Sequence, residues 1–224
     1  MPTIRSILIT REQGSFLRLA QWCKSHNIQF FQIPFIKIEA VLELDIPETD
    51  WIFFNSPKGA QSYLNHYPIR ANKIAVLAEG TADVIKAAHL PIDFIGDSRN
   101  NPEIIGQNFN SLLLECSTVL LPIGNRSKRS IIDQIDPSKA REIITYNTND
   151  QHHKAPQNID VILFTSPSNF NSYVHSNQIP TETLVVAIGN TTGMAIRSFS
   201  SKLKLEVLTT PTESAFIKFL ENKL

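Results

Sequence analysis

The sequence lacks an excess of charge of either sign. Its 224 residues include 21 Lys and Arg and 21 Asp and Glu, so the formal net charge is zero. A protein without a basic field has no general attraction for nucleic acid or for an anionic membrane surface. We therefore expect neither partner, and an anionic ligand must be held by local groups.

Cysteine and long hydrophobic runs are also scarce. The two cysteines, Cys23 and Cys116, lie far apart and form no metal-binding or redox motif. No stretch approaches the roughly 20 apolar residues that span a bilayer. The opening MPTIRSILIT lacks the apolar core of a signal peptide. From these absences we expect a cytoplasmic protein with both thiols reduced.

The usual nucleotide and metal motifs are missing as well. The chain contains neither G-x-G-x-x-G nor G-x-x-x-x-G-K-[ST]. His152 and His153 are adjacent in the polar run NDQHHKAPQN, which indicates a solvated loop rather than a metal site. No carboxylate pair and no Ser-His-Asp or Cys-His arrangement can be assigned from spacing. We predict no metal and no cofactor.

The sequence does contain an internal repeat. FNSPKGAQSY at residues 54–63 and FTSPSNFNSY at residues 164–173 share five of ten residues at an offset of 110. SILITREQ near the start matches TVLLPIGNRS at an offset of 112, and KIAVLAEGTADVI matches LVVAIGNTTGMAI at an offset of 111. Three units that recur in the same order predict two similar lobes.

Short apolar runs, each followed by a polar cluster and a helix-compatible segment, indicate alternating strands and helices. Continuous runs such as WIFF and VILF are typical of parallel strands that are covered on both faces. The predicted fold class is therefore α/β, and two extended segments, residues 30–41 and 142–148, can cross between the lobes. The six predicted strands are residues 6–10, 51–55, 73–78, 118–122, 160–165 and 184–188.

The strand ends carry residues that begin helices and attract anions. In FNSP and FTSP, a favoured N-cap precedes a favoured first helical residue, so the simplest role of Ser56 and Ser166 is capping. A helix start at the carboxyl end of a parallel strand also presents free N–H groups, which bind anions. By the same argument we expect Thr81 and Thr192 to cap the helices after AEGTA and IGNTTG.

Other strand ends add candidates for an anion site, and one tyrosine is a candidate proton donor. On sequence alone, Tyr146 in ITYNT is most simply an amphipathic strand residue, but its hydroxyl is protonated at neutral pH and can donate a proton. The further strand-end candidates are Thr10, Arg11, Gly80, Gly124, Asn125, Arg126 and Gly189.

The motifs together resemble one protein family. In chain order, the motifs are the opening strand with ThrArg, then FFNSP, AEGTA, LLPIGNR, ITYNT, LFTSP and AIGNTT. Their order and approximate spacing resemble those of the uroporphyrinogen-III synthase family over nearly the whole chain. The resemblance implies two similar flavodoxin-like lobes with parallel sheets, a two-stranded β connector, and a cleft that the repeated motif lines. The expected domains are residues 1–35 with 148–224 and residues 36–147, with connector strands near 31–40 and 142–148.

The resemblance also implies an activity. Members of this family are lyases that cyclise hydroxymethylbilane, a linear tetrapyrrole with eight carboxylates, to uroporphyrinogen III with loss of water and inversion of ring D. Departure of the hydroxyl leaves a cation that the far ring attacks at its substituted carbon, and the spiro intermediate fragments and recloses. Because the bilane cyclises unaided to the uninverted isomer, the enzyme has to fold the substrate and assist departure. We expect a monomer.

Site residues follow from the resemblance by position. Tyr146 is placed near the leaving hydroxyl, and Thr192 is the second catalytic candidate. Two departures from the family pattern affect the cleft turns, since Ala78 stands where Gly is common and Gly193 where Ala is common. The residues expected to line the substrate are Ser56, Ser166, Thr191, Gly124 and Asn125.

Two other functions stay open at this point. One is a non-catalytic two-lobe module that binds a polycarboxylate or a tetrapyrrole. The other is a different enzyme with the same architecture, such as a sugar-phosphate isomerase, which needs a general base that the sequence does not reveal.

Overall fold

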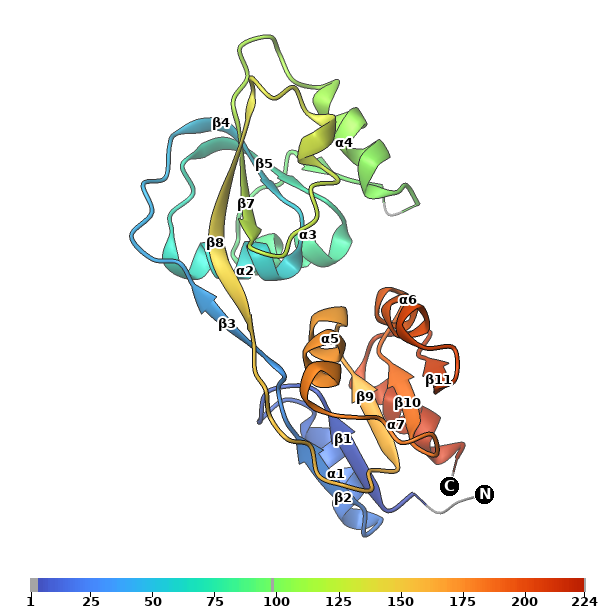
Figure 1. Ribbon diagram of the computed structural model, residues 1–224. Coiled ribbons are helices and arrows are strands. Elements are labelled where there is room, and N and C mark those ends of the chain that lie inside the picture. The colour runs from blue at the N-terminus through green and yellow to red at the C-terminus, as the bar shows by residue number, and fades with distance from the viewer. Residues whose placement is uncertain (1–3, 98, 224) are drawn as a thin grey trace. The chain divides into compact units, whose positions relative to one another are not determined.

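The computed structural model describes residues 4–97 and 99–223 (Figure 1). These residues form an α/β fold with largely parallel sheets and seven α-helices, which confirms the predicted fold class. None of the described helices is long and apolar enough to cross a membrane. The chain folds into two compact units, of which unit 1 runs to Lys37 and resumes at Asn149, and unit 2 spans Ile38–Thr148.

Unit 1 is a five-stranded sheet between two layers of helices. Its elements are β1 (Ser6–Ile9), α1 (Leu17–Ser25), β2 (Gln29–Gln32), β9 (Val161–Phe164), α5 (Pro167–Ser176), β10 (Leu184–Ala187), α6 (Asn190–Phe199), β11 (Lys204–Val207) and α7 (Glu213–Glu221). The strand order is β11-β10-β9-β1-β2, and neighbouring strands run parallel. Successive strand residues face opposite layers. Ile9 therefore packs with α1 and α7, whereas Leu8 packs with α5 and α6.

Unit 2 has the same layered plan. Its elements are β3 (Ile36–Ala40), β4 (Thr49–Phe54), α2 (Pro57–His66), β5 (Ala71–Val76), α3 (Glu79–Ala87), β6 (Phe94–Ile95), α4 (Pro102–Asn110), β7 (Val119–Gly124), a 3₁₀ turn η1 (Ile132–Gln134) and β8 (Ala140–Asp150). The sheet order is β3-β8-β7-β4-β5-β6. Phe54 packs with α2 and α3 on one face, and Phe53 packs with α4 on the other.

The two sheets place corresponding strands in the same order. Strands β11, β10, β9, β1 and β2 of unit 1 correspond to β6, β5, β4, β7 and β8 of unit 2. All six strands predicted from apolar runs are present, as β1, β4, β5, β7, β9 and β10. The repeat in the sequence is therefore a repeat in the fold.

The extended segment at residues 30–41 forms two strands instead of one. Strand β2 belongs to the sheet of unit 1, whereas β3 belongs to the sheet of unit 2. Pro34 lies between them and has no N–H to continue a ladder. The next backbone N–H, that of Phe35, donates to Asn169 Oδ1 at 2.9 Å. The chain leaves unit 1 within β3 and returns to it within β8.

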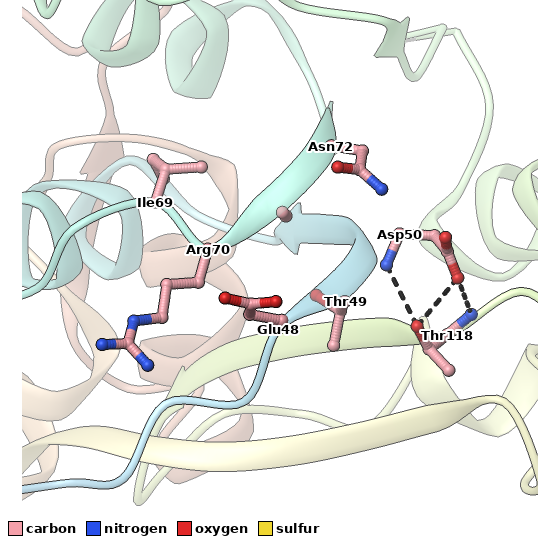
Figure 2. A pocket seen from close by; sticks show the side chains of 8 residues that line it. Glu48, Thr49, Asp50, Ile69, Arg70, Asn72 and Thr118 are labelled. Atoms are coloured by element: carbon pink, nitrogen blue, oxygen red, sulfur yellow. Dashed lines mark hydrogen bonds between the residues drawn. The ribbon is translucent and has the colours of Figure 1, made fainter.

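Both sheets are tied at the amino ends of their strands by the same side-chain arrangement. In unit 1, Asp160 Oδ2 accepts hydrogen bonds from Arg5 N, Ser6 N and Ser6 Oγ at 2.8, 2.9 and 3.0 Å. In unit 2, Asp50 Oδ2 accepts from Thr118 N and Thr118 Oγ1, both at 2.9 Å (Figure 2). These bonds hold the pKa of the Asp50 carboxyl below its ordinary value, and the bond from the Thr118 backbone N–H has the largest effect.

Candidate functional site at the carboxyl ends of the strands

Ser56 and Ser166 begin the helices that follow the repeated motif, as predicted. Ser56 Oγ accepts from Gly59 N at 3.0 Å, and α2 begins at the next residue. Ser166 Oγ accepts from Asn169 N at 3.1 Å and also from Asn169 Nδ2 at 3.1 Å. Both hydroxyl oxygens are therefore engaged in capping, at the carboxyl ends of β4 and β9.

The helices after AEGTA and IGNTTG begin earlier than predicted. Ala78 is the N-cap of α3 and Gly189 is the N-cap of α6, and neither end has a side-chain capping bond. Thr81 and Thr192 lie inside the first turns and are buried, so the prediction that they cap these helices was wrong. Within the described residues, neither N-cap side chain accepts a hydrogen bond from the first N–H groups of its helix, which suits these groups to an anion.

The two departures from the family pattern have different consequences. Ala78 at φ −162° and Gly189 at φ −174° have the same extended backbone, so Ala in place of Gly leaves the turn unchanged. Gly193 is required by packing, because a Cβ on it would lie 2.7 Å from Val207 Cγ2 of β11. The corresponding residue of unit 2, at an offset of 111, is the buried Ala82.

The two uncapped helix ends differ in charge. In α3, Glu79 occupies the first turn and pairs with Lys86 at 3.4 Å. The first turn of α6 contains no acidic residue, and its Asn190 and Thr191 are exposed. Because a carboxylate in the first turn already interacts with the helix dipole, α6 is the better site for an external anion.

At the strand end of unit 1, the side chain of Thr10 is part of the scaffold. It is fully buried, and its Oγ1 accepts from Thr165 N at 3.1 Å. Thr165 Oγ1 in turn donates to the Thr10 carbonyl at 2.6 Å, so these residues join β1 to β9. Arg11 is exposed, with its guanidinium carbon 5.7 Å from the centre of the Phe16 ring. Of the ThrArg pair, only the Arg11 side chain faces solvent.

At the strand end of unit 2, the structure brings Gly124, Asn125 and Tyr146 together. Asn125 N donates to the Tyr146 carbonyl at 3.2 Å, and Asn125 Oδ1 accepts from Thr148 N at 2.8 Å. Gly124 N donates to Ser127 Oγ at 3.0 Å. Tyr146 is buried, with 8% of its surface exposed. Gly124 N, Asn125 N and Asn125 Oδ1 are thus bound within this unit, and Asn125 and Arg126 are both exposed.

Sequence reasoning missed three polar residues at these strand ends. Ser127 binds Gly124 N, and Asn169 joins the N-cap of α5 to the backbone of Phe35. Asn55 Oδ1 is buried and, within the described residues, has no hydrogen-bond partner. The available signal for Asn55 was its position as the last residue before the FNSP serine.

A separate hollow lies at the opposite ends of the strands in unit 2. It measures about 490 Å³ and lies beside the amino ends of β4 and β5 (Figure 2). Its Asp50 is already bound by Thr118, and none of the predicted site residues lines it. No group of three or more His, Cys, Asp or Glu side chains within residues 4–97 and 99–223 could hold a metal ion. The polar groups at the carboxyl ends are therefore the better candidates.

A family comparison decides between the possibilities that the sequence left open. The family model for uroporphyrinogen-III synthase HemD matches residues 18–217. The chain belongs to the uroporphyrinogen-III synthase family. The resemblance inferred from the motifs is thereby confirmed.

A curated relative agrees with this family. The chain is 30% identical over 95 residues to the chloroplastic uroporphyrinogen-III synthase of Oryza sativa subsp. japonica. The aligned stretch covers 37% of this chain and 31% of the rice protein.

Solved structures of uroporphyrinogen-III synthases have the same fold. The enzyme from Helicobacter pylori superposes with a TM-score of 0.70 at 16% identity, covering 99% of this chain and 100% of that one. A mutant enzyme from Thermus thermophilus superposes with a TM-score of 0.65 at 12% identity, covering 97% and 98% of the two chains. At these identities the likeness supports the fold alone.

Proposed function

We propose that this protein is a cyclising hydro-lyase that converts hydroxymethylbilane to uroporphyrinogen III with loss of water and inversion of ring D. The observation that carries the proposal is the family match, which extends over residues 18–217 and so includes parts of both units. It favours the enzyme over a non-catalytic module that binds a polycarboxylate or a tetrapyrrole.

We propose that the substrate carboxylates bind at the carboxyl ends of the strands. The uncapped first turn of α6 supports this role for Gly189, Thr191 and Thr192, because its N-cap, Gly189, offers no side chain to accept from the first N–H groups. Since the Thr192 side chain is buried, its contribution is through the backbone N–H. Gly80 and Thr81 have the equivalent place in α3, where we propose a weaker contribution because Glu79 already occupies that helix end.

Charged side chains supply the remaining contacts in this proposal. Arg11 and Arg126 are exposed at the ends of β1 and β7, where a guanidinium can pair with a carboxylate. Thr10, Ser56 and Ser166 support these groups by ordering the strand ends and helix starts.

Tyr146 is the proposed acid that assists departure of the hydroxyl. Its ring is fixed in β8 beside the end of β7, and a neutral phenol can donate a proton to the leaving oxygen. We expect Tyr146→Phe to lower kcat by about 10²-fold or less, at or below the lower end of the roughly 10²–10⁴-fold range for general acids, because the bilane ionises readily and water can replace the phenol. Affinity for the tetrapyrrole product should change little, because the carboxylates bind elsewhere.

We also propose that the units are two similar flavodoxin-like domains, residues 1–35 with 148–224 and residues 36–147. The strand order of unit 1, β2-β1-β9-β10-β11, supports this, since it follows the flavodoxin-like order. In that order, ligands bind where the chain reverses direction across the sheet, between β1 and β9. We further propose that the enzyme acts as a monomer without a metal or nucleotide.

The test is the isomer composition of the product. Purified protein is supplied with hydroxymethylbilane, and the type I and type III products are separated after oxidation to porphyrins. The proposal predicts predominantly the type III isomer, whereas heat-denatured protein leaves only the type I isomer that forms unaided. Type I product alone from the native protein contradicts the proposal. Dialysis against a chelator should leave the rate unchanged.

A further inference from the structure

The end of β7 passes directly beneath the ring of Tyr146. A Cβ placed on Gly124 would lie 2.4 Å from Tyr146 Cζ, 2.5 Å from Cε2 and 2.7 Å from the hydroxyl oxygen. Such distances are far inside van der Waals contact, where carbon atoms are normally about 3.5–4.0 Å apart. Any side chain at position 124 must therefore displace the tyrosine ring.

The need for glycine comes from the ring and not from the backbone. Gly124 does not have a positive φ, so an L-residue can adopt its backbone conformation. Its closest side-chain neighbours are the atoms of one side chain, that of Tyr146. The absence of a Cβ at position 124 thus defines where the phenol lies.

The backbone around this contact is held in place on both strands. The pairing of β7 with β8 shifts register between Ile123 and Gly124, so that Gly124 lies opposite Tyr146. The shift is secured by the bond from Asn125 N to the Tyr146 carbonyl at 3.2 Å. On the other side, Ser127 N donates to the Gly124 carbonyl at 2.9 Å, and Ser127 Oγ accepts from Gly124 N at 3.0 Å. A bulge of this kind re-aims a side chain.

We propose that Gly124 is a positioning residue that acts on the reaction through Tyr146. Its backbone N–H and carbonyl are both bound by Ser127, so its contribution is the space it leaves for the phenol. The inference rests on the proposed function, in which the Tyr146 hydroxyl assists departure of the leaving group. Asn125 has the related task of holding the bulge that presents Tyr146.

Testing Gly124→Ala both with Tyr146 present and in the Tyr146→Phe variant separates an effect on positioning from an effect on stability. In the Tyr146 enzyme, we expect Gly124→Ala to lower kcat by about tenfold to 10²-fold, because a displacement of about 1 Å is enough for such a loss. In the Tyr146→Phe enzyme, Gly124→Ala should lower kcat by less than about twofold, since no hydroxyl remains to be misplaced. Product affinity should stay within about twofold throughout, and the loss of thermal stability should be similar in both backgrounds.

Gly106→Ala is the matched control. Gly106 lies in α4 of the same unit, and a Cβ there would meet Gln134 Cβ at 2.9 Å and the Ile131 carbonyl oxygen at 3.1 Å. This variant should lose stability without touching Tyr146. Its kcat per folded molecule should equal that of the unmodified protein.

A second readout does not depend on turnover. The chain has four tyrosines, so ring-labelled tyrosine gives few NMR signals, and Tyr146→Phe identifies the one that belongs to Tyr146. Gly124→Ala should move this signal, whereas Gly106→Ala should not. An unmoved Tyr146 signal, or an equal loss of kcat in both backgrounds, overturns the inference while the proposed function stands. Absence of type III product from the unmodified protein overturns both.

Discussion

Asp160 in unit 1 and Asp50 in unit 2 each accept hydrogen bonds from the residue that precedes or begins a neighbouring strand, Ser6 or Thr118. The two pairs are related by offsets of 110 and 112, so the amino ends of the sheets are true copies. The carboxyl ends are not copies, because among the described residues the contact between Tyr146 and Gly124 occurs in unit 2 alone. The two units thus share the bonds that hold the amino ends of their strands and differ in the groups at the carboxyl ends.

The contrast extends to single residues at the strand ends. In unit 1, Thr165 bonds to both the hydroxyl and the carbonyl of Thr10. The corresponding residues of unit 2 are Asn55 and Pro122, at offsets of 110 and 112. Pro122 offers neither an N–H nor a hydroxyl, so Asn55 Oδ1 receives no hydrogen bond from the residues that the structure describes.

The largest effect should come from breaking the copied amino-end bonds. Asp160→Ala removes the acceptor of three hydrogen bonds and should lower the free energy of unfolding by about 3 kcal/mol. Asp50→Ala removes two and should cost less. Denaturant unfolding measures both, with the exposed Asp45→Ala as control. Equal stabilities of Asp160→Ala and Asp45→Ala would show that these bonds do not hold the sheet.

A packing difference between the units should give the next largest effect. Gly193→Ala places a Cβ 2.7 Å from Val207 Cγ2 and should cost about 2 kcal/mol through overpacking. In the Val207→Ala background the same substitution should be neutral or stabilising, because the obstructing methyl group is gone and Ala favours a helix. Additive losses in the double variant would place the strain elsewhere. Ala82, the unit 2 counterpart, already has a Cβ at this position.

Tyr63 in unit 2 and Tyr173 in unit 1 should differ by a smaller amount in their contribution to stability at neutral pH. The Tyr63 hydroxyl donates to the Pro68 carbonyl at 3.0 Å, and no counterpart of this bond is found for Tyr173 within the described part of the chain. Tyr63→Phe should therefore cost about 1 kcal/mol, and Tyr173→Phe should cost less. Thermal melting of both variants at pH 7 tests this, and a larger loss for Tyr173→Phe would reverse the comparison.

At high pH the two phenols should behave alike. Burial raises the pKa of Tyr63 and of Tyr173 to about 12. Because the folded pKa lies above the unfolded value of about 10, the stability that each neutral phenol contributes is complete below pH 10 and is lost as the pH rises toward 12. Each Tyr→Phe variant should flatten this alkaline loss of stability. An unchanged pH profile in both would mean that these phenols do not control it.

Local patterns predicted what local chemistry determines. Ser followed by Pro identified both capped helices, since the cap, the proline and the helix lie within four residues. The starts of α3 and α6 were misplaced because several neighbouring residues could serve as N-cap. The contact of Gly124 with Tyr146, 22 residues later, needs a register shift between β7 and β8. The bond between Ser6 and Asp160 joins residues that are 154 positions apart. Such pairings depend on the tertiary fold, which motifs do not encode.

The difference between the carboxyl ends of the two sheets is tested most directly by placing a carboxylate at the N-cap of each uncapped helix. Gly189→Asp and Ala78→Asp should both raise thermal stability slightly, because Asp caps a helix and interacts with its dipole. Gly189→Asp should raise KM for hydroxymethylbilane by about tenfold, the equivalent of one lost charge-assisted hydrogen bond, whereas Gly189→Asn should raise it less. Ala78→Asp should change KM by less than about twofold, because Glu79 already occupies that helix end. Equal KM values for the two Asp variants, or a larger increase for Ala78→Asp, would contradict the account.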